Sequence, residues 1–487
     1  MDLHVGSHTQ QLPMTSRYSW FYGAYPFNNN PNDVNPHHFY DETRARFDRD
    51  YPQGTKVRLQ VTSTSQSPTF TIDLADFELV GPAQPQPDGS VSVMQYGADP
   101  HGNQDSTHAF QQAVDVGRNE HKTVYIPEGH FKLWDHVIID QVTITGAGPW
   151  YSVIGGRHPT DRSKTGGLFG RYDADGGSSH NVHLSNFAII GEITERDDNA
   201  PTNAIGGSLS DSSIDNLWLQ HVKCGAWFDG RMNNFVMKNT RILDTTADGV
   251  NFHLGVSNSR IENTFVRNTG DDGLAMWSDR YVQSGNKFVR NTVVLPMLAN
   301  NIAIYGGRDM EISDNLVIDT ITNGGGIHIA NRFTNVRGET GVQGNFKVER
   351  NTMIRAGGSD TNWKFGVGAF WVDAWNDDIH ANINVKDCEI IDASYQAVGL
   401  IEGNIYGVVF DNLHINGTGT YALQIQVKQS GEVTFRNTHS TGVGRSNPIY
   451  NCSPQFKINV EGDRNGWYTD HPECAGINIQ DVHPNRH

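Results

Sequence analysis

The chain is poor in cysteine, poor in basic residues and free of long apolar runs. Its 487 residues include four cysteines, and 37 lysines and arginines stand against 54 aspartates and glutamates, giving a formal net charge of −17. Such an acidic surface disfavours nucleic acid and anionic membrane surfaces, because like charges repel. No run of 18 apolar residues is present, so the sequence predicts no transmembrane helix. We therefore expect neither nucleic acid nor a membrane among its partners.

The few cysteines fit no zinc-ligand spacing, and no metal ligands are assigned. Cys452 and Cys474 lie in polar stretches near the C-terminus, where a disulfide would stabilise the fold by about 3 kcal/mol in the chain-entropy model. Cys224 and Cys388 are flanked by strand-like sequence, so we expect them to be buried free thiols.

Glycine, by contrast, is abundant at 51 residues, and frequent glycine and asparagine indicate many turns between short strands. The chain is too long for one ordinary domain. The proline- and glutamine-rich residues 82–90 form the clearest linker. They separate a partial β-sandwich domain at residues 1–81, which we expect to be truncated, from a second domain at residues 91–487.

Both domains open with recognisable elements. Before the linker, residues 3–5, 11–14, 56–61 and 70–74 are predicted strands, and residues 39–47 a short helix. After it, residues 105–107 have the composition of a helix N-cap, and Phe110, Ala113 and Val114 share one face of a helix running to about Gly117. This helix would plug the end of a stacked β-structure, whose first coil otherwise exposes its core.

The rest of the chain is an irregular repeat of about 24 residues. Asparagine or aspartate precedes a short apolar strand at positions 216, 239, 263, 291, 315, 351, 387, 412 and 437. A second strand in each repeat carries apolar pairs two residues apart: Val250/Phe252, Leu274/Met276, Ile302/Ile304, Ile327/Ile329, Val398/Leu400 and Leu423/Ile425. Alternation places these pairs inside, and stacked asparagines are expected to form an amide ladder. A propeller blade needs about 40–45 residues, so the pattern predicts an all-β, right-handed parallel β-helix.

Three aspartates coincide in this repeat. Residues 248–252 (DGVNF) return 24 residues later as 272–276 (DGLAM), and Asp271 precedes the second copy. Coils stack about 4.8 Å apart, so Asp248 and Asp272 should lie one above the other, with Asn300 at the equivalent place in the next coil. One Asp-Gly pair is usually just a turn. Two in adjacent coils, beside a third carboxylate, indicate a metal site or proton-transfer chemistry.

Three uses of this patch are open from the residues alone. An inverting glycosidase needs one protonated acid and one carboxylate base, and crowding raises carboxylate pKa values. Calcium could instead bridge the carboxylates to an acidic substrate, as in pectate-lyase chemistry. The patch could also be a structural calcium site in a protein that binds carbohydrate without cleaving it.

Residues 245–253 (TTADGVNFH) and 268–278 (NTGDDGLAMWS) resemble the active-site motifs of glycoside hydrolase family 87. The resemblance covers nearly the whole chain. It implies a β-sandwich followed by a right-handed β-helix, as in bacterial α-1,3-glucanases and mycodextranases. The Gly-His-Gly and Arg-Ile-Lys elements of the more distant polygalacturonases are missing here, which favours a neutral glucan as substrate.

The resemblance implies a role for each aspartate. Asp271 would be the general acid on the glycosidic oxygen, and Asp248 and Asp272 would together deprotonate the attacking water. Because a stacked pair at about 5 Å has the spacing of a retaining enzyme, a displaced Asp271 is expected to create the wider gap that inversion needs. No cofactor is required, although a structural Ca²⁺ is an open option.

Polar and aromatic residues near the motifs are candidates for substrate binding, because sugars stack on flat rings and bond to amides and imidazoles. They are Asn251, His253, Trp277, Asn300, Tyr305, His328, Trp363, Trp371 and Trp375. Insertions at residues 331–345 and 357–378 are expected to wall the cleft.

The leading hypothesis is an endo-acting, inverting α-1,3-glucanase. Alternatives are a mycodextranase, dextranase or polygalacturonase-like hydrolase, a polysaccharide lyase, and a non-catalytic carbohydrate-binding protein. We expect a monomer that acts outside the cell on a polysaccharide. The first residues lack the basic-then-apolar pattern of a signal peptide, so its leader is expected to be absent from this chain.

Overall fold

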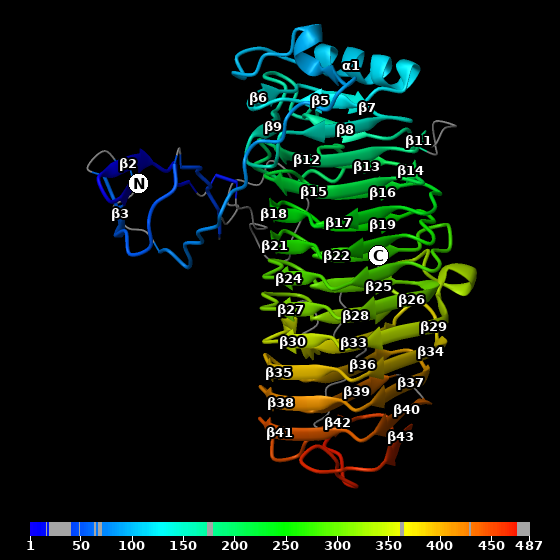
Figure 1. Cartoon of the computed structure of the whole chain (residues 1–487). Helices are drawn as coiled ribbons and strands as arrows, with labels where there is room; N and C mark the ends of the chain where they lie inside the picture. Colours follow the sequence, from blue (N-terminus) through cyan, green and yellow to red (C-terminus); the bar gives the residue numbers. More distant parts are fainter. Residues whose placement is uncertain are drawn as a thin grey trace.

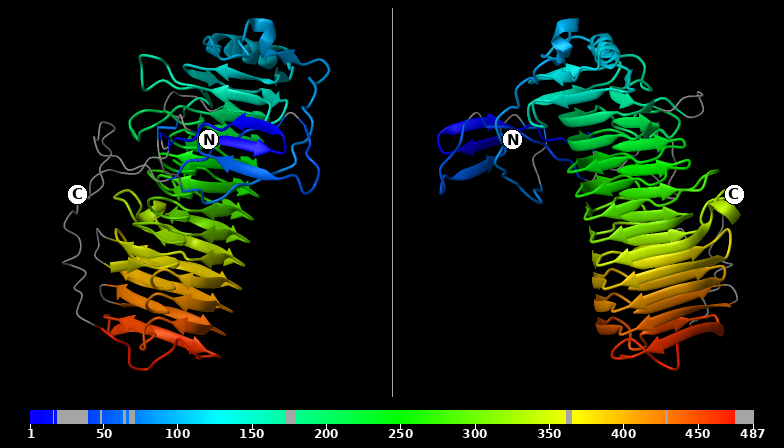
Figure 2. Two further views of the ribbon diagram at one scale, coloured as in Figure 1. Left: turned by 90° about the vertical axis from the view of Figure 1, so that its left-hand side faces the viewer. Right: turned by 45° about the vertical axis from the view of Figure 1, so that its right-hand side comes forward.

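The chain forms a column of stacked coils beneath a capping helix, with a small separate sheet beside it (Figures 1 and 2). The computed structural model describes residues 1–15, 17–18, 40–47, 49–62, 65–66, 71–172, 179–360, 365–427 and 430–474. Successive strands pair in parallel from one coil to the next, which confirms the predicted parallel β-helix.

One face of the column is a 12-stranded parallel sheet. Its strands are β7 (His136–Ile138), β10 (Gly167–Phe169), β13 (Ile205–Gly207), β16 (Ala226–Asp229), β19 (Val250–His253), β22 (Leu274–Trp277), β25 (Ile302–Tyr305), β28 (Ile327–Ala330), β33 (Phe370–Ala374), β36 (Val398–Glu402), β39 (Leu423–Val427) and β42 (Ile449–Asn451).

The other faces form one continuous set of parallel strands. The first strands of successive coils are β4 (Val91–Ser92), β5 (Val124–Ile126), β8 (Thr143–Gly146), β12 (His183–Ile190), β15 (Ser213–Gln220), β17 (Val236–Lys238), β20 (Arg260–Glu262), β23 (Lys287–Val289), β26 (Gly307–Ser313), β29 (Val342–Glu349), β34 (Ile379–Lys386), β37 (Ile405–Asp411), β40 (Ser430–Arg436) and β43 (Gln455–Glu461). The strands that follow them are β6 (Gly129–Lys132), β9 (Ser152–Gly155), β18 (Arg241–Thr245), β21 (Phe265–Thr269), β24 (Thr292–Val294), β27 (Leu316–Ile318), β30 (Thr352–Ile354), β35 (Glu389–Ala393), β38 (His414–Thr418) and β41 (His439–Val443). Two short pairs lie outside these faces: β11 (Ser179–His180) with β14 (Leu209–Ser210), and β31 (Gly358–Asp360) with β32 (Phe365–Val367).

The predicted plug is α1 (Thr107–Glu120), which lies across the first coil (Figure 1). Its buried face includes Phe110, Ala113 and Val114. The Phe110 ring packs edge-on against Phe131 of β6, with ring centroids 5.6 Å apart. The helix therefore closes the apolar core of the column, as expected. No helix in the described part of the chain is long and apolar enough to cross a membrane.

The N-terminal unit is a three-stranded antiparallel sheet of β2 (His8–Gln11), β1 (Asp2–Val5) and β3 (Val57–Gln60). The predicted helix at residues 39–47 is wrong: residues 40–47 have no regular secondary structure. They lie against the column instead, where Glu42 pairs with Arg267 at 2.6 Å and Asp41 with His221 at 2.8 Å. The predicted strand at residues 70–74 is also wrong, since residues 71–74 form none and Phe70 lies outside the described residues.

The predicted apolar pairs do fill the column. Val250 and Phe252 are fully buried, and so are their counterparts Leu274 and Met276 in the next coil. The residues between them, such as Ala275, point out of the coil but are covered by other side chains. Val336, from the segment after β28, packs over that outer face. This packing places part of the predicted 331–345 insertion on the sheet that carries the candidate site.

The asparagines that were expected to form one ladder occupy two different positions in the coils. Pairing of Lys238 with Glu262, and of Glu262 with Val289, puts Asn239 and Asn263 one position ahead of Asn291. Asn239 and Asn263 have φ values of 52° and 48°, a left-handed turn conformation that asparagine tolerates well. The repeat therefore places asparagine at two structurally different positions, which the spacing alone did not separate.

The second of these positions is occupied by Asn291, Asn315 and Asn351, which form a buried amide ladder. The Asn291 amide group donates to Oδ1 of Asn315 at 3.1 Å, and Asn315 donates in the same way to Asn351 at 3.0 Å. The backbone N–H groups of Asn291 and Asn315 donate to the same oxygens. Each side chain thus satisfies a turn that would otherwise bury unpaired polar groups.

We expect Asn315→Ala to lower the free energy of unfolding by about 3 kcal/mol, because it leaves the backbone N–H of Asn291 buried without an acceptor. Thermal or denaturant unfolding measures the change. Asn384→Ala, at an exposed position of β34, is the matched control and should change stability by less than about 0.5 kcal/mol. Equal stability of both variants would contradict a structural role for the ladder.

The cysteines behave as predicted. Cys452 and Cys474 form a disulfide, and Cys224 and Cys388 are buried and free. The disulfide fastens the end of β42 to the segment that follows β43.

Candidate active site

The three aspartates meet at the entrance to two neighbouring strands of the 12-stranded sheet. Val250 of β19 pairs with Leu274 of β22, so Asp248 and Asp272 occupy the same position in adjacent coils. Carboxylate oxygens from Asp248, Asp271 and Asp272 all lie within 4.8 Å of one another. We call these three residues the trio. The structure thus brings together the residues that the repeat aligned.

Asp272 is fixed by the next coil. Its Oδ1 accepts hydrogen bonds from the backbone N–H and the side-chain amide of Asn300, at 2.7 and 2.9 Å. Its Oδ2 accepts one from the Tyr305 hydroxyl at 2.8 Å. Asn300 occupies the position equivalent to Asp272 one coil further on, because Leu274 pairs with Ile302. Neighbouring coils therefore hold this buried carboxyl in one orientation.

The other two carboxyls have different surroundings. Asp248 is buried and accepts a hydrogen bond from the Asn251 amide at 2.9 Å. Asp271 is the most open of the trio, with 23% of its side chain exposed. Its Oδ1 accepts from the backbone N–H of Asp272 at 3.0 Å, and its Oδ2 accepts from Arg196 at 2.6 Å.

Burial and mutual repulsion raise the pKa values of the two inner carboxyls. Burial raises the pKa of Asp272 to about 7, and the charge of Asp271 adds to the shift. Burial also raises the pKa of Asp248 well above its ordinary value, with further contributions from Asp271 and Asp272. A carboxyl with a pKa of about 7, such as Asp272, exchanges protons near neutral pH, which is what general acid–base catalysis requires.

Arg196 is a component of the site that the sequence did not reveal. Only 11% of its side chain is exposed, and its guanidinium contacts both Asp271 and Asp198. These carboxylates outweigh the effect of burial and raise the pKa of Arg196, so it remains cationic. Buried Lys223 donates to the Ala200 carbonyl at 2.5 Å and so ties down the segment that carries Arg196. This segment lies outside the aligned repeats, so the periodicity contained no signal for it.

A column of side chains continues outward from the trio along the sheet. Strand pairing places Asp229, His253, Trp277 and Tyr305 at equivalent positions in four successive coils. The His253 ring lies 4.7 Å from the Trp277 ring, and its nitrogens contact Asp229 at 3.0 Å and Asp279 at 3.3 Å. Tyr305 joins this column to Asp272. The arrangement offers flat rings and polar groups beside the carboxyls.

Two further aromatic residues complete this surface. Phe333, after β28, lies 5.1 Å from the Trp277 ring and 4.9 Å from the Tyr305 ring. Trp227 lies 5.1 Å from His253. Neither was a sequence candidate, because Phe333 belongs to an insertion and Trp227 lies one coil before the first aspartate motif. Trp227 is partly buried, and Phe333 is exposed.

The remaining candidates lie behind the trio or away from it. Trp371 is buried and donates to Oδ1 of Asn300 at 3.1 Å. His328 is completely buried between Tyr305 and Trp371, and burial lowers its pKa, which keeps it neutral. Trp375 is partly buried beside Arg332. Trp363 lies outside the described residues. The predicted substrate contacts of these residues stay predictions.

One geometric expectation is wrong. Asp271 was expected to stand apart and create a wide acid-to-base gap, but its carboxylate lies within 4.8 Å of both partners. The reason is the hydrogen bond from the Asp272 backbone, which turns Asp271 back toward the stack.

Among the residues that the structure describes, two clusters have oxygen or nitrogen atoms close enough to share a metal ion: the trio, and Asp41 with His221 and Asp244. Three carboxylate oxygens suit a hard cation such as Ca²⁺, which takes six to eight oxygen ligands. In the second cluster, hydrogen bonds already join His221 to Asp41 and Gln220 to Asp244. That cluster accounts for how residues 40–47 attach to the column.

Known proteins share this architecture and these sequence features. Residues 103–467 match the model of the α-1,3-glucanase catalytic domain D2, and residues 1–80 match that of domain D1. The catalytic unit of a thermostable family 87 α-1,3-glucanase from Streptomyces thermodiastaticus strain HF3-3 is 35% identical, with a TM-score of 0.81. That match covers 96% of this chain and 84% of the other. The Agl-KA catalytic domain is 26% identical, with a TM-score of 0.80, covering 94% and 84%.

A comparison with curated proteins found no match. The two domain models together cover most of the chain, and the Streptomyces enzyme is similar along nearly all of it. This chain therefore belongs to glycoside hydrolase family 87, and it is a glucan hydrolase built on a parallel β-helix.

Proposed function

We propose that the chain is an endo-acting α-1,3-glucanase that inverts the anomeric configuration. The observation that carries the proposal is the trio, held at matched positions of adjacent coils beside a column of aromatic rings. Its similarity to an α-1,3-glucanase at 35% identity supports the linkage. Two more distant structures of the same fold, 22–23% identical, are family 87 α-1,3-glucanases in complex with nigerose and with tetrasaccharides.

In the proposed reaction, a proton held by the inner carboxyls passes to Asp271, which gives it to the glycosidic oxygen as the bond from that oxygen to the anomeric carbon breaks. Its position at the open side of the trio suits this contact, because Asp248 and Asp272 are more deeply buried. A water molecule attacks the anomeric carbon from the opposite face. Asp248 and Asp272 hold that water and take its proton, so one proton leaves the acid and one arrives at the base pair.

The spacing within the trio does not by itself support inversion, since retaining enzymes place two carboxyls about 5 Å apart and inverting ones about 6.5–9.5 Å. The third carboxyl does support it. Retention needs one nucleophile and one acid–base group, whereas two stacked carboxyls with raised pKa values are suited to holding and deprotonating one water.

The first test is the release of reducing ends from purified polysaccharides. We expect hydrolysis of α-1,3-glucan at a rate at least about tenfold above that of nigeran, dextran or polygalacturonate. Faster cleavage of one of the other polymers would reassign the linkage. Products that absorb in the ultraviolet, together with loss of activity on adding a chelator, would indicate a lyase. Binding without new reducing ends would indicate a non-catalytic protein.

The second test is the configuration of the first product. With an α-linked glucan, inversion releases the β-anomer, which then mutarotates. Proton NMR during the first minutes of reaction should therefore show the β-anomeric signal before the α signal. Initial appearance of the α-anomer would overturn the inverting mechanism and leave the hydrolase assignment intact.

We further propose that the protein acts outside the cell. The support is the disulfide between Cys452 and Cys474, since disulfides form and persist in oxidising compartments.

A further inference from the structure

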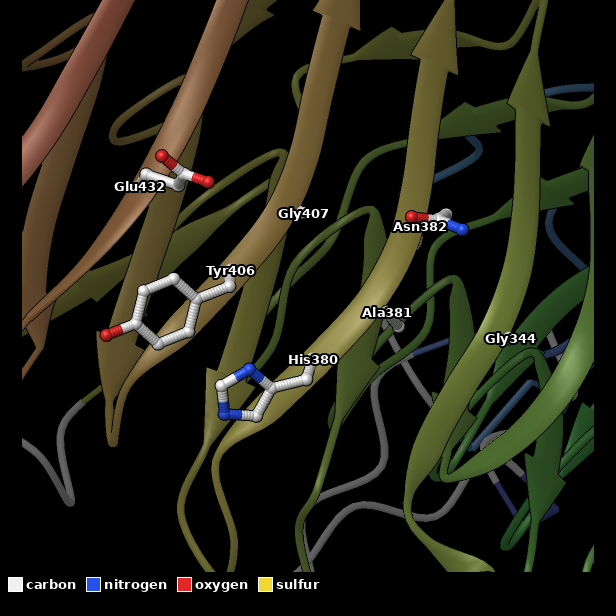
Figure 3. A pocket seen from close by; sticks show the side chains of 7 residues that line it. All are labelled: Gly344, His380, Ala381, Asn382, Tyr406, Gly407 and Glu432. Carbon is white, nitrogen blue, oxygen red and sulfur yellow. The ribbon is translucent and has the colours of Figure 1, made fainter.

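A groove of about 340 Å³ lies on a face of the β-helix that carries none of the trio. Its lining comes from β29, β34, β37 and β40, and includes His380, Asn382, Tyr406, Gly407 and Glu432 (Figure 3). The trio instead precedes strands of the 12-stranded sheet. The groove is therefore separate from the catalytic centre, and its volume falls at the lower end of small-molecule sites, about 300–1,000 Å³.

Irregular strand pairing produces the hollow. The register shifts between His380 and Ile383, where β34 meets β37, and again between Ile405 and Val408, where β37 meets β40. Bulges of this kind leave backbone polar groups out of the ladder and often adjoin binding sites. Gly407 has a φ of 80°, and a Cβ there would lie 2.1 Å from the Ala381 carbonyl oxygen. Backbone atoms therefore form the floor of the groove, and residue 407 must be glycine because a side chain there would clash with the neighbouring strand.

Two aromatic rings form one wall. His380 pairs with Tyr406 in the strand register, and their rings stack with centroids 4.8 Å apart and planes 11° from parallel. Figure 3 shows the two rings side by side on neighbouring strands. The Tyr406 hydroxyl contacts Ser430 at 2.8 Å, which holds the ring in place. The outer face of this stack is flat and suits the apolar face of a sugar ring.

The remaining groups are polar and carry no positive charge. The Asn382 amide donates to Asn345 at 3.1 Å, which orients its oxygen. Glu432 is exposed and forms no ion pair with any residue in the described ranges. Lys457 is its neighbour on β43 in the strand register, and the Glu432 carboxylate can accept hydrogen bonds from hydroxyl groups. The chemistry favours a neutral ligand rich in hydroxyl groups.

We propose that this groove is a second glucan-binding site, which holds a short neutral segment of the polymer away from the catalytic trio. The inference rests on the proposed function, since it supplies a glucan as the ligand. Attachment at a second point raises the effective concentration of enzyme on an insoluble polymer without altering turnover of a short soluble one. The site should therefore matter for insoluble α-1,3-glucan and not for oligosaccharides.

The test uses the full chain carrying Asp271→Asn, which prevents hydrolysis during binding measurements. The double variant His380→Ala/Tyr406→Ala should bind insoluble α-1,3-glucan about tenfold more weakly in a depletion assay, as expected for the loss of a stacking surface. Asn384→Ala, two residues along the same strand from Asn382, is the matched control and should bind like the parent. With Asp271 restored, the double variant should hydrolyse a soluble α-1,3-linked tetrasaccharide at the parental rate.

Direct placement comes from NMR of the His380 ring during titration of the Asp271→Asn protein with the tetrasaccharide, where a saturable shift is expected. If the double variant unfolds, Glu432→Gln with Asn382→Ala replaces it, because both side chains are exposed. If these variants bind glucan as tightly as the parent, and the wild-type chain hydrolyses α-1,3-glucan, then the second site is overturned and the proposed function is not. A chain that neither hydrolyses nor binds the glucan overturns the proposed function as well.

Discussion

Asp271→Asn, Asp248→Asn and Asp272→Asn are each expected to lower kcat on α-1,3-glucan by about 10³-fold or more, with the fold intact. The amide of asparagine has nearly the shape of a carboxyl but neither donates a proton to a leaving group nor accepts one from water. Initial-rate measurements with a reducing-sugar assay supply the kinetics. Asp411→Asn, at a partly exposed position of β37, is the control and should retain full activity.

Asp272→Asn carries a second expectation, which separates a catalytic role from a structural one. In the folded protein the pKa of Asp272 is raised to about 7, against about 3.9 in an unfolded chain. Between about pH 4 and 7 the folded state holds the extra proton, so wild-type stability falls as pH rises through this window. Asparagine can keep the contacts with Asn300 and Tyr305 without a charge. The inactive variant should therefore melt at a higher temperature than wild type at pH 8, by about 2 °C or more.

Two results would count against these expectations. Near-normal turnover in any one of the three variants would remove that residue from the proton-transfer scheme. A melting temperature of Asp272→Asn well below that of wild type at pH 8 would mean that its loss of activity reports damage to the fold.

Arg196→Gln is expected to have the second-largest effect, lowering kcat/KM by at least about tenfold on the acidic side of the pH optimum and much less on the alkaline side. The guanidinium opposes the burial and repulsion that raise the pKa of Asp248. Without it that pKa rises further, and Asp248 must be ionised to act as a base. The acidic limb of the pH–rate profile should move upward by about one unit, since an opposite charge at close range shifts a carboxyl pKa by about 1–3 units.

Arg196→Lys keeps the charge and should recover a substantial part of the acidic limb, while losing the fork that contacts Asp198 and Asp271 together. Arg350→Gln removes an exposed guanidinium from its ion pair with Asp314 and is the matched control. A uniform loss of activity at every pH, with no movement of the limb, would show that Arg196 positions Asp271 mechanically and does not tune the carboxyls.

Much of the fold was predictable because successive coils of a β-helix need the same types of residue at the same positions. Each coil needs an apolar pair such as Val250 and Phe252 inside and turn residues at the corners, so the pattern recurs about every 24 residues. The same periodicity aligned Asp248 with Asp272. It failed at residues 40–47, where Asp41 and Glu42 are paired with His221 and Arg267, 180 and 225 positions away in the chain.

Side-chain direction was the weaker part of the prediction. The repeat placed Asp271 next to the stack but could not show the hydrogen bond from the Asp272 backbone that turns its carboxylate inward. It also treated Asn239 and Asn291 as equivalent, although they lie one position apart in the coil. One residue of offset changes an exposed left-handed turn into a buried amide ladder.

By itself, the sequence determined the parallel β-helix, the capping helix, the buried cysteines and the three carboxyls at neighbouring coils, because all of these follow from local composition and from a period. Only the tertiary structure decided the electrostatics of the site. Arg196 meets Asp271 across 75 residues of chain, Phe333 reaches Trp277 from an insertion, and β34 and β37 form a groove by losing register. Such contacts depend on where irregular segments end in space, and a repeat carries no information about the segments that interrupt it.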